Sequence, residues 1–235
     1  MDRAALVTGG SSGIGRAIAR MLREEGYELT LASRRAEKVE AAAAELGAHA
    51  VAVNLGDPSE CARAVAAHEE RFGRLDVLVN SAGIGIAGAI ADLPTKHLDL
   101  QLDINLRGLV LVTQAAIPLL RESHGWIVNL ASIAGTLPSP GLSIYGATKA
   151  AVISLTRTLN EELDADGVRA IALCPGFVDT PMAEWSGIDP EAMIRPEDCA
   201  EVVRMCLRLS PQARIAQVVI ERVGSVNGDA PLSGA

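Results

Sequence analysis

The chain has 235 residues, of which 49 % are hydrophobic and only 3 % aromatic, with 21 basic and 29 acidic side chains and a formal net charge of −8. This length suits one globular domain, so a single domain over residues 1–235 is expected. The negative charge and the lack of a long Lys/Arg run exclude a nucleic-acid surface, because phosphate binding needs a clustered positive field.

A membrane span, a signal peptide and a metal site are not expected either. The longest stretch without a formal charge, residues 125–148, contains Pro138, Pro140 and several hydroxyl groups, which would leave a membrane helix broken and polar. Residues 1–3 lead directly into an apolar run, so we expect a cytoplasmic protein. The four cysteines and four histidines show no metal-ligand spacing, and the thiols are expected to be reduced and buried.

Short apolar runs of strand type alternate with longer segments of helical periodicity. One helix start is sharply marked at Asp57-Pro58-Ser59-Glu60, where an N-cap acid precedes a proline at the first helical position and a glutamate follows. Strand–helix alternation predicts the α/β class, with a parallel sheet covered on both faces. The seven expected strands are residues 4–8, 29–32, 50–53, 77–80, 126–130, 169–173 and 217–220, and the tail, residues 224–235, is expected to fray.

The first expected strand runs into a glycine-rich turn, Thr8-Gly9-Gly10-Ser11-Ser12-Gly13-Ile14-Gly15, which opens an expected helix. At such a junction glycine lets the backbone turn tightly and approach an anion, while the unpaired amides and the positive dipole end of the helix face that anion. The pattern predicts a cradle for the pyrophosphate of a dinucleotide. An ordinary Gly/Ser turn is the alternative.

The second expected strand is followed by Ser33-Arg34-Arg35, about twenty residues beyond the glycine loop. A fold that binds NAD usually has an acid here for the ribose hydroxyls. That acid is absent, and a guanidinium can grip a 2′-phosphate with paired hydrogen bonds. The segment therefore favours NADP (NADPH) as the cofactor, against the alternative of two solvated arginines that open a surface helix.

Tyr145 and Lys149 are four residues apart in a segment of helical composition, which places both on one helix face. An ammonium beside a tyrosine stabilises the tyrosinate, so we expect a Tyr145 pKa below the ordinary value of about 10 and closer to the range useful in acid/base catalysis. Most basic residues of the chain are arginine, so a lysine at this position favours a specific role for Lys149. The alternative is a packed aromatic residue beside a surface lysine.

Two further polar residues, Ser132 and Asn105, are candidates for the site. Ser132 follows the apolar run 126–130, so its hydroxyl emerges at the carboxyl edge of an expected strand, where open parallel sheets bind ligands. It can hold a substrate oxygen, with Ser139 and Ser143 as the alternatives for this role. Asn105 lies inside a long helical pattern, residues 97–120, where asparagine is a poor helix former. This indicates a compensating interaction, against the alternative of a solvent-facing side chain.

In chain order, Thr8-Gly9-x-x-x-Gly13-x-Gly15, Asn80-Ser81-Ala82-Gly83, Asn105, Ser132, Tyr145-x-x-x-Lys149 and Pro175-Gly176 with Thr180 resemble the motifs of the short-chain dehydrogenases/reductases. The resemblance covers residues 6–220 and implies a doubly wound Rossmann fold, a seven-stranded parallel sheet flanked by helices. It implies that Tyr145 is the general acid/base and that Ser132 orients the carbonyl. Lys149 would serve the tyrosine and the nicotinamide ribose, and the Asn105 carbonyl would hold a water of a proton relay.

The activity that the resemblance implies is NADP(H)-dependent interconversion of a carbonyl and a secondary alcohol in a small molecule. An NAD-dependent alcohol dehydrogenase with the same residues and a catalytically silent nucleotide-binding sensor are the alternatives. Residues 182–195 are expected to form a lid. A homodimer or homotetramer is expected through the helices with residues 105–120 and 145–163, with Leu109, Val112, Ala151 and Ile153 as candidate contacts. The expected cofactor contacts are Gly9, Ser11, Ser12, Gly13, Ile14, Gly15, Ser33, Arg34, Arg35, Asn54, Leu55, Asn80, Ala82, Gly83, Tyr145, Lys149, Pro175, Gly176, Val178 and Thr180.

Three positions depart from the family pattern. Ser81 stands where a second asparagine is usual. Asn54-Leu55 replaces an aspartate and a small apolar residue near the adenine, although the asparagine amide can still hydrogen-bond the base. After the last expected strand, Glu221-Arg222 stands where the family often has a glycine pair.

Overall fold

One parallel sheet of seven strands organises the chain in the computed structural model, which describes residues 3–224. The strand order is β3-β2-β1-β4-β5-β6-β7, and all neighbours are parallel. This is the doubly wound Rossmann order, so the predicted fold class is confirmed. The strands are β1 (Ala4–Thr8), β2 (Glu28–Ser33), β3 (His49–Ala52), β4 (Val77–Asn80), β5 (Trp126–Leu130), β6 (Arg169–Pro175) and β7 (Gln217–Ile220).

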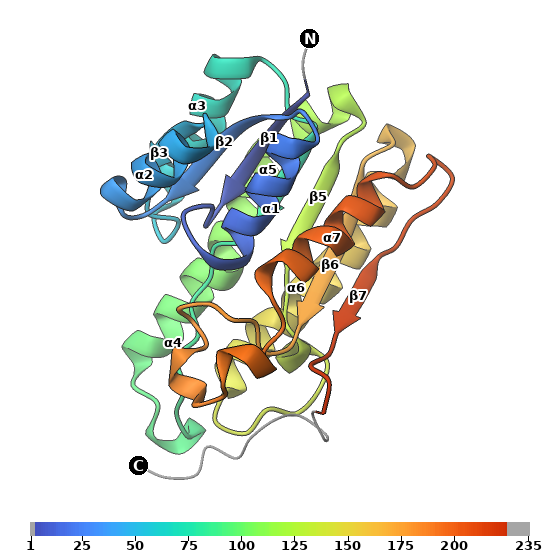
Figure 1. Cartoon of the computed structure of the whole chain (residues 1–235). Helices are drawn as coiled ribbons and strands as arrows, with labels where there is room; N and C mark the ends of the chain where they lie inside the picture. The colour runs from blue at the N-terminus through green and yellow to red at the C-terminus, as the bar shows by residue number, and fades with distance from the viewer. Residues whose placement is uncertain (1–2, 225–235) are drawn as a thin grey trace.

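Helices cover both faces of the sheet (Figure 1). One face carries α1 (Gly13–Glu24), α2 (Ala36–Leu46) and α7 (Pro196–Leu207), and the other carries α3 (Pro58–Phe72), α5 (Leu109–Ser123) and α6 (Ser143–Glu162). The short helix α4 (Thr95–Leu102) continues through a π-helical stretch, η2 (Asp103–Gly108), into α5. Single 3₁₀ turns are η1 (Ile90–Asp92), η3 (Ile133–Gly135), η4 (Asp164–Asp166), η5 (Glu184–Ser186) and η6 (Pro190–Ala192).

The start of α3 follows from its sequence. The Asp57 carboxylate accepts the Ser59 N–H at 2.9 Å, and Pro58 takes the first helical position, as predicted. The Glu60 carboxylate binds the Arg63 guanidinium. The helix ends at Gly73, whose φ of +67° is the left-handed conformation that a glycine cap supplies at little cost.

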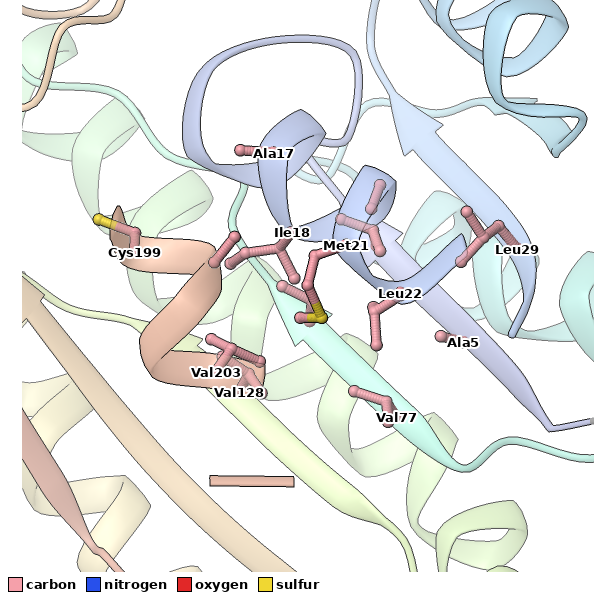
Figure 2. Close-up of a cluster of buried hydrophobic side chains, with 14 of the residues drawn as sticks. Ala5, Ala17, Ile18, Met21, Leu22, Leu29, Val77, Val128, Cys199 and Val203 are labelled. Atoms are coloured by element: carbon pink, nitrogen blue, oxygen red, sulfur yellow. The ribbon is translucent and has the colours of Figure 1, made fainter. Parts of the chain in front are cut away.

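The core between α1, α7 and the sheet fixes the glycine loop in place. Apolar side chains of α1 and α7 interlock above β1, β4 and β5, as Figure 2 shows. Because these side chains are buried, α1 cannot shift without opening the core, and its N-terminus is held at the carboxyl edge of the sheet. This core includes Ala17, Ile18, Met21 and Leu22 of α1, Cys199 and Val203 of α7, and Ala5, Val77 and Val128 of the strands.

The continuous helical run Thr95–Ser123 is long and apolar enough to cross a membrane by length and composition, with a mean hydropathy of 1.2 in its most apolar window. It is the one such helix within residues 3–224, and 44 % of that window is buried inside the fold. The run consists of α4, η2 and α5, which pack against α3 and α6. A core helix of a globular protein shows the same pattern.

Two predictions concern the ends and the cysteines. The tail expected to fray lies outside the described residues from 225 onwards, so the single domain over residues 1–235 stays a prediction. All four cysteines are free and buried, at positions Cys61, Cys174, Cys199 and Cys206.

Candidate active site

A cavity of about 1120 Å³ opens at the carboxyl edge of the sheet, where β4, β5 and β6 end. Ligands of doubly wound sheets bind at this edge, where the strand order reverses. Three of the four predicted catalytic residues line it, and the fourth, Asn105, is buried behind it. Of the other predicted residues, it is lined by Ile14, Gly83, Pro175, Gly176, Val178 and Thr180.

The glycine loop between β1 and α1 closes on two other predicted cofactor segments. A Cβ at Gly9, where φ is +66°, would lie 2.8 Å from the Ala82 nitrogen, and one at Gly15 would lie 2.6 Å from the Gly9 oxygen. A Cβ at Gly13, where φ is +53°, would lie 3.0 Å from Cγ2 of Thr180. Side chains at these positions would clash with backbone or the facing threonine. The loop therefore forms a narrow backbone cradle between the ends of β1, β4 and β6.

The N-terminus of α1 carries no anion of its own. Its N-cap residue, Ser12, makes no side-chain capping bond, and its first turn has no acidic residue. By contrast, α3 is capped by Asp57, and α7 has Glu197 and Asp198 in its first turn. The N–H groups of α1 are thus left to an external anion. A dinucleotide pyrophosphate fits this cradle.

The end of β2 lies beside the glycine loop. The Ser33 Oγ is 2.9 Å from the Ser11 Oγ, which ties the two segments together. Arg34 and Arg35 are both exposed, and neither forms an ion pair within residues 3–224. Nearby arginines such as Arg16 are paired with glutamates. Positive charge without a carboxylate partner at this place fits a phosphate group.

Three residues predicted to contact the cofactor also form hydrogen bonds or core contacts within the protein. The Asn54 Oδ1 accepts the Gly56 N–H, which leaves the amide of this exposed side chain as a donor. The Leu55 side chain is buried in the core below α3, so only its backbone can face a ligand. The buried Asn80 amide donates to Thr113 and to the Asn129 Oδ1, both at 2.9 Å, and so holds β4 to α5 and β5.

Lys149 lies behind Tyr145 on α6. Its side chain is 5 % exposed, its Nζ donates to the Leu130 carbonyl at 2.7 Å, and it stands 5.6 Å from the centre of the Tyr145 ring. Burial lowers the pKa of Lys149 to about 8, because the ammonium loses water that one carbonyl cannot replace. The alternative of a surface lysine does not apply here.

Tyr145 is exposed only in part, and it lines the cavity together with Ser132. Loss of water raises the pKa of Tyr145, and the neighbouring Ser132 hydroxyl offsets this rise only in part. This is opposite to the expected direction, because the expectation rested on the ammonium of Lys149, whereas the dehydration of the phenol has the larger effect. Ser132 also accepts the Ala134 N–H, whereas Ser143 is exposed.

Asn105 lies in the π-helical stretch and is wholly buried, so the solvent-facing alternative is wrong. Its Oδ1 accepts the Ile84 N–H, and its Nδ2 donates to the Ile84 carbonyl, both at 2.8 Å. A Cβ on Gly83 would lie 3.3 Å from the Asn105 Oδ1 and 3.5 Å from the Lys149 Nζ. The side chain therefore fixes the loop after β4 beside the lysine. The water relay through its backbone carbonyl stays a prediction.

Gln101 is a further residue of the site, and it was not predicted from the sequence. It is wholly buried on α4, and its Oε1 accepts the Ile86 N–H at 3.2 Å, one helical turn before Asn105. The two amides hold the backbone at Ile84 and Ile86, while the intervening Gly85 lines the cavity. The available signal was the i, i+4 spacing of two amide residues on one helix face.

The first part of the expected lid lies over the cavity. Within residues 182–195, Met182, Ala183, Trp185 and Ser186 line it, whereas residues 187–195 do not. The Trp185 ring packs edge-on against Phe177, with ring centres 6.0 Å apart. Apolar lid side chains thus form one wall of the substrate space. No group of three or more His, Cys, Asp or Glu among residues 3–224 is placed to hold a metal ion.

A family model described as short chain dehydrogenase matches residues 3–189. The chain belongs to the short-chain dehydrogenase/reductase family. Curated relatives include oxidoreductases of Staphylococcus epidermidis and Staphylococcus aureus. The first is 35 % identical over 225 residues, and the second is 34 % identical over 226 residues. In both cases the match covers 94 % of this chain and 98 % of the relative.

Solved structures of this family share the fold and carry nicotinamide cofactors. An alcohol dehydrogenase from Thermococcus sibiricus, complexed with 5-hydroxy-NADP, has a TM-score of 0.88 at 29 % identity and covers 95 % of this chain and 98 % of its own. A 3-ketoacyl-(acyl-carrier-protein) reductase from Brucella melitensis, complexed with NADH, gives the same four values. A Burkholderia cenocepacia short-chain dehydrogenase in complex with NADP has a TM-score of 0.86 at 33 % identity, covering 93 % and 96 %. The chain is therefore an oxidoreductase of this family.

Proposed function

We propose that the protein is an NADP(H)-dependent oxidoreductase that interconverts a carbonyl and a secondary alcohol. The observation that carries the proposal is that Tyr145, Ser132 and the buried Lys149 line one cavity, with the Lys149 Nζ 5.6 Å from the centre of the Tyr145 ring and the glycine cradle beside them. A proton donor, a carbonyl-orienting hydroxyl and an anion cradle at one sheet edge are the parts that such a reaction needs.

The cofactor would be held by the glycine cradle and by the polar segment at the end of β2. The cradle of Gly9, Gly13 and Gly15 with the α1 N-terminus suits the pyrophosphate, and Arg34 with Ser33 suits the 2′-phosphate. Further contacts are proposed for Arg35, Asn54 and the segment from Pro175 to Thr180. When bound, NADPH supplies the hydride that the protein itself cannot provide.

The chain's own residues supply the proton and the orientation. A raised Tyr145 pKa keeps the phenol protonated at neutral pH, so in the direction of reduction it can donate to the carbonyl oxygen. The Ser132 hydroxyl lines the same cavity and can donate to the same oxygen, which favours the negative charge that develops there. Below a pH of about 8, the Lys149 ammonium stabilises the tyrosinate that is left after the transfer.

Particular residues favour the proposed function over its two alternatives. The NADH complex of the Brucella reductase shows that this fold also accepts NAD, but the exposed Arg34 and Arg35 favour a 2′-phosphate here. The intact Tyr145–Ser132 pair speaks against a catalytically silent sensor. Buried unpaired cysteines support a cytoplasmic location, and a homo-oligomer is proposed in line with the family.

A panel of ketones and aldehydes tests the proposal, with NADPH or NADH followed by the loss of reduced-cofactor absorbance. We expect at least one carbonyl compound to be reduced, and faster with NADPH than with NADH at equal concentration. Tight NADPH binding with no turnover on the whole panel would support the silent sensor instead.

A further inference from the structure

The cavity wall has a space beside Tyr145 that no side chain fills. Gly85, in the loop after β4, is exposed and lines the cavity. A Cβ at this glycine would lie 3.8 Å from Cδ2 and 3.9 Å from Cε2 of the Tyr145 ring, and 3.9 Å from the Met182 sulfur. A side chain at residue 85 would therefore occupy the space between the tyrosine and the lid. We call this space the Gly85 slot.

The backbone at residue 85 does not require a glycine. Its φ is not positive, so an ordinary side chain can be carried without strain. A Cβ there would meet no atom closer than 3.8 Å, whereas a Cβ at Gly9 would lie 2.8 Å from the Ala82 nitrogen. Gly9 permits a close approach of two backbone segments. Gly85, in contrast, leaves room inside the cavity.

Hydrogen bonds hold the loop on both sides of Gly85. The wholly buried amides of Asn105 and Gln101 bind the backbone of its two neighbours, at 2.8 Å and 3.2 Å. Further along the loop, the Gly88 N–H donates to the Gly141 carbonyl at 2.8 Å. A shift of the loop toward the tyrosine would leave buried polar groups without partners, which is costly. The slot is therefore a fixed feature of the cavity.

The slot is apolar and lies next to the reacting group. The three atoms nearest to it are two aromatic carbons and a thioether sulfur. The phenol hydroxyl is attached to the ring carbon beside Cε2, so a carbonyl bound by Tyr145 directs one of its two substituents toward the slot. On the lid side, Met182 is 43 % exposed, and its unbranched side chain adapts to the shape of a ligand. An alkyl group in this place is removed from water, which favours binding.

We propose that Gly85 is a specificity-determining residue, and that the slot takes an alkyl group attached to the carbonyl carbon of the substrate. Ketones with extended alkyl chains are then the substrate class. The inference rests on the proposed function and deepens it. Occupation of the slot by the cofactor is the competing outcome, because NADPH shares the cavity.

The test compares two symmetrical ketones, 3-pentanone and 4-heptanone, with NADPH. Either ketone must direct one chain toward the slot whichever way it binds, and the chains differ by one methylene group. The wild type should have the higher kcat/KM for 4-heptanone. Gly85→Val fills the slot and should lower the ratio of kcat/KM for 4-heptanone to that for 3-pentanone by about 10- to 200-fold, the range for one methylene group in an apolar pocket.

Two further variants separate the slot from a general effect of valine. Ala91→Val, in η1 and outside the cavity lining, adds bulk to the same loop and should leave the ratio of the two ketones unchanged. Met182→Ala shortens the side chain on the opposite side of the slot. Combined with Gly85→Val it should recover much of the lost ratio, because residues that share one space are not independent.

Several results would overturn the inference. They are a wild-type preference for 3-pentanone, an equal loss for both ketones in Gly85→Val, no recovery in the double variant, and a loss of calorimetric NADPH affinity in Gly85→Val as the main effect. Reduction of both ketones without discrimination would leave the proposed function standing while the slot fails. If neither ketone is reduced, calorimetric binding of 4-heptanone to the protein with NADP⁺ decides. No binding, or binding that Gly85→Val does not weaken, contradicts the inference.

Discussion

Lys149 is the buried cation of the candidate active site. The side chain is almost fully buried and lies among partners that include the Leu130 carbonyl and the face of the Tyr145 ring. Burial lowers its pKa from an ordinary 10.5 to about 8, because the charged form has lost most of its water. The ammonium is therefore present at pH 7 and is lost in mildly alkaline solution.

This lysine predicts a pH dependence. Its proton is held below a pH of about 8, so kcat/KM for NADPH, which reports ionisations of the free protein, should be level between pH 6 and 7 and fall as the pH rises through about 8. The measurement is the initial rate at low NADPH and saturating carbonyl substrate. A profile that stays level to pH 9.5 would contradict the role given to the Lys149 charge.

Arg34 predicts the cofactor preference. A hydrogen bond to a charged group contributes roughly 1.5–3 kcal/mol, and about 1.4 kcal/mol is tenfold in affinity. Arg34→Ala should therefore weaken NADPH binding by about 10- to 150-fold and leave NADH binding almost unchanged, with Arg35 softening the loss. Calorimetric titration with both cofactors checks this, and Lys38→Ala, an exposed cation on α2, is the matched control. Equal wild-type affinity for NADPH and NADH would contradict the NADP assignment.

At the residue scale, motif order and spacing were enough to name the residues that gather at the cavity. Ser132, Tyr145 and Lys149 could be predicted because the carboxyl edge of a strand and one face of a helix are local geometry. The direction of the Tyr145 pKa could not, because it depends on how much water the folded cavity excludes. Gln101 was missed since its partner, Ile86, lies 15 residues earlier in a loop without regular structure.

Helix α3 is tied to the sheet by a buried histidine. The His68 side chain is wholly buried, with Nε2 2.9 Å from the Arg74 carbonyl and Nδ1 2.8 Å from the Thr30 hydroxyl. Since a carbonyl only accepts, Nε2 carries the proton and Nδ1 accepts from Thr30. Burial lowers the pKa of His68 to about 4, because a charged imidazole would lack water in this place.

His68 predicts acid sensitivity of the fold. Its pKa is about 4 when folded and 6.5 when unfolded, so its contribution is complete above pH 6.5 and is lost as the pH falls toward 4. Between pH 7 and 5 this loss amounts to about 2 kcal/mol. The free energy of unfolding, measured by urea at pH 7 and at pH 5, should fall for the wild type. For His68→Gln, whose amide stays neutral, the fall should be smaller by about this amount. An equal drop in both proteins would contradict the assignment.

At the element scale, six of the seven expected strands lie within one residue of both observed ends, because the apolar runs are short and sharply bounded. The seventh, β6, extends two residues further, to Pro175. The single helix expected over residues 97–120 is instead α4, η2 and α5. Asn105 binds the loop after β4 within this π-helical stretch, a tertiary contact that helical periodicity does not contain. Gly108 approaches the Leu55 carbonyl too closely for a side chain, which is also a tertiary constraint.

The whole molecule leaves apolar side chains exposed on α4 and α5. Leu109, Val112 and Ile153, expected as candidate oligomer contacts, are buried in the core and cannot serve an interface, because they face the protein's own packing. Ala151 is partly exposed. Exposed apolar residues on these helices are Leu100 at 40 %, Leu102 at 39 % and Val110 at 36 %. The dimer is predicted to form through the helices with residues 105–120 and 145–163. Val110 lies in the first of these, and a contact that extends onto α4 would also cover Leu100 and Leu102.

A light-scattering measurement checks the dimer. At micromolar concentration the wild type should show at least twice the 24.5 kDa mass of one chain. The double variant Leu102→Asp with Val110→Asp should dissociate, because charges would be buried without partners in the contact. Ile90→Asp, in the exposed turn η1, is the control and should leave the mass unchanged. A wild type that is monomeric at this concentration contradicts the expectation.

At the scale of the whole chain, strand–helix alternation was sufficient for the doubly wound sheet, since short parallel connections leave few other topologies. The residues that form the cavity walls could be predicted from the sequence only in part. Its walls come from the loop after β4, the segment after β5, the lid and the residues after β7, which meet only once the sheet is assembled. The placement of Arg222 beside Gly176 depends on the pairing of β6 with β7 and is invisible in the sequence.

The central claim is that Tyr145 delivers the proton in an NADPH-dependent carbonyl reduction, and one paired measurement on Tyr145→Phe tests it most directly. With a carbonyl substrate found in the panel, turnover of the variant should fall by about 10² to 10⁴-fold, the usual contribution of a general acid. NADPH affinity by calorimetry should stay nearly unchanged, since only the hydroxyl is removed. A variant that binds NADPH normally and keeps half of the wild-type turnover would contradict the account.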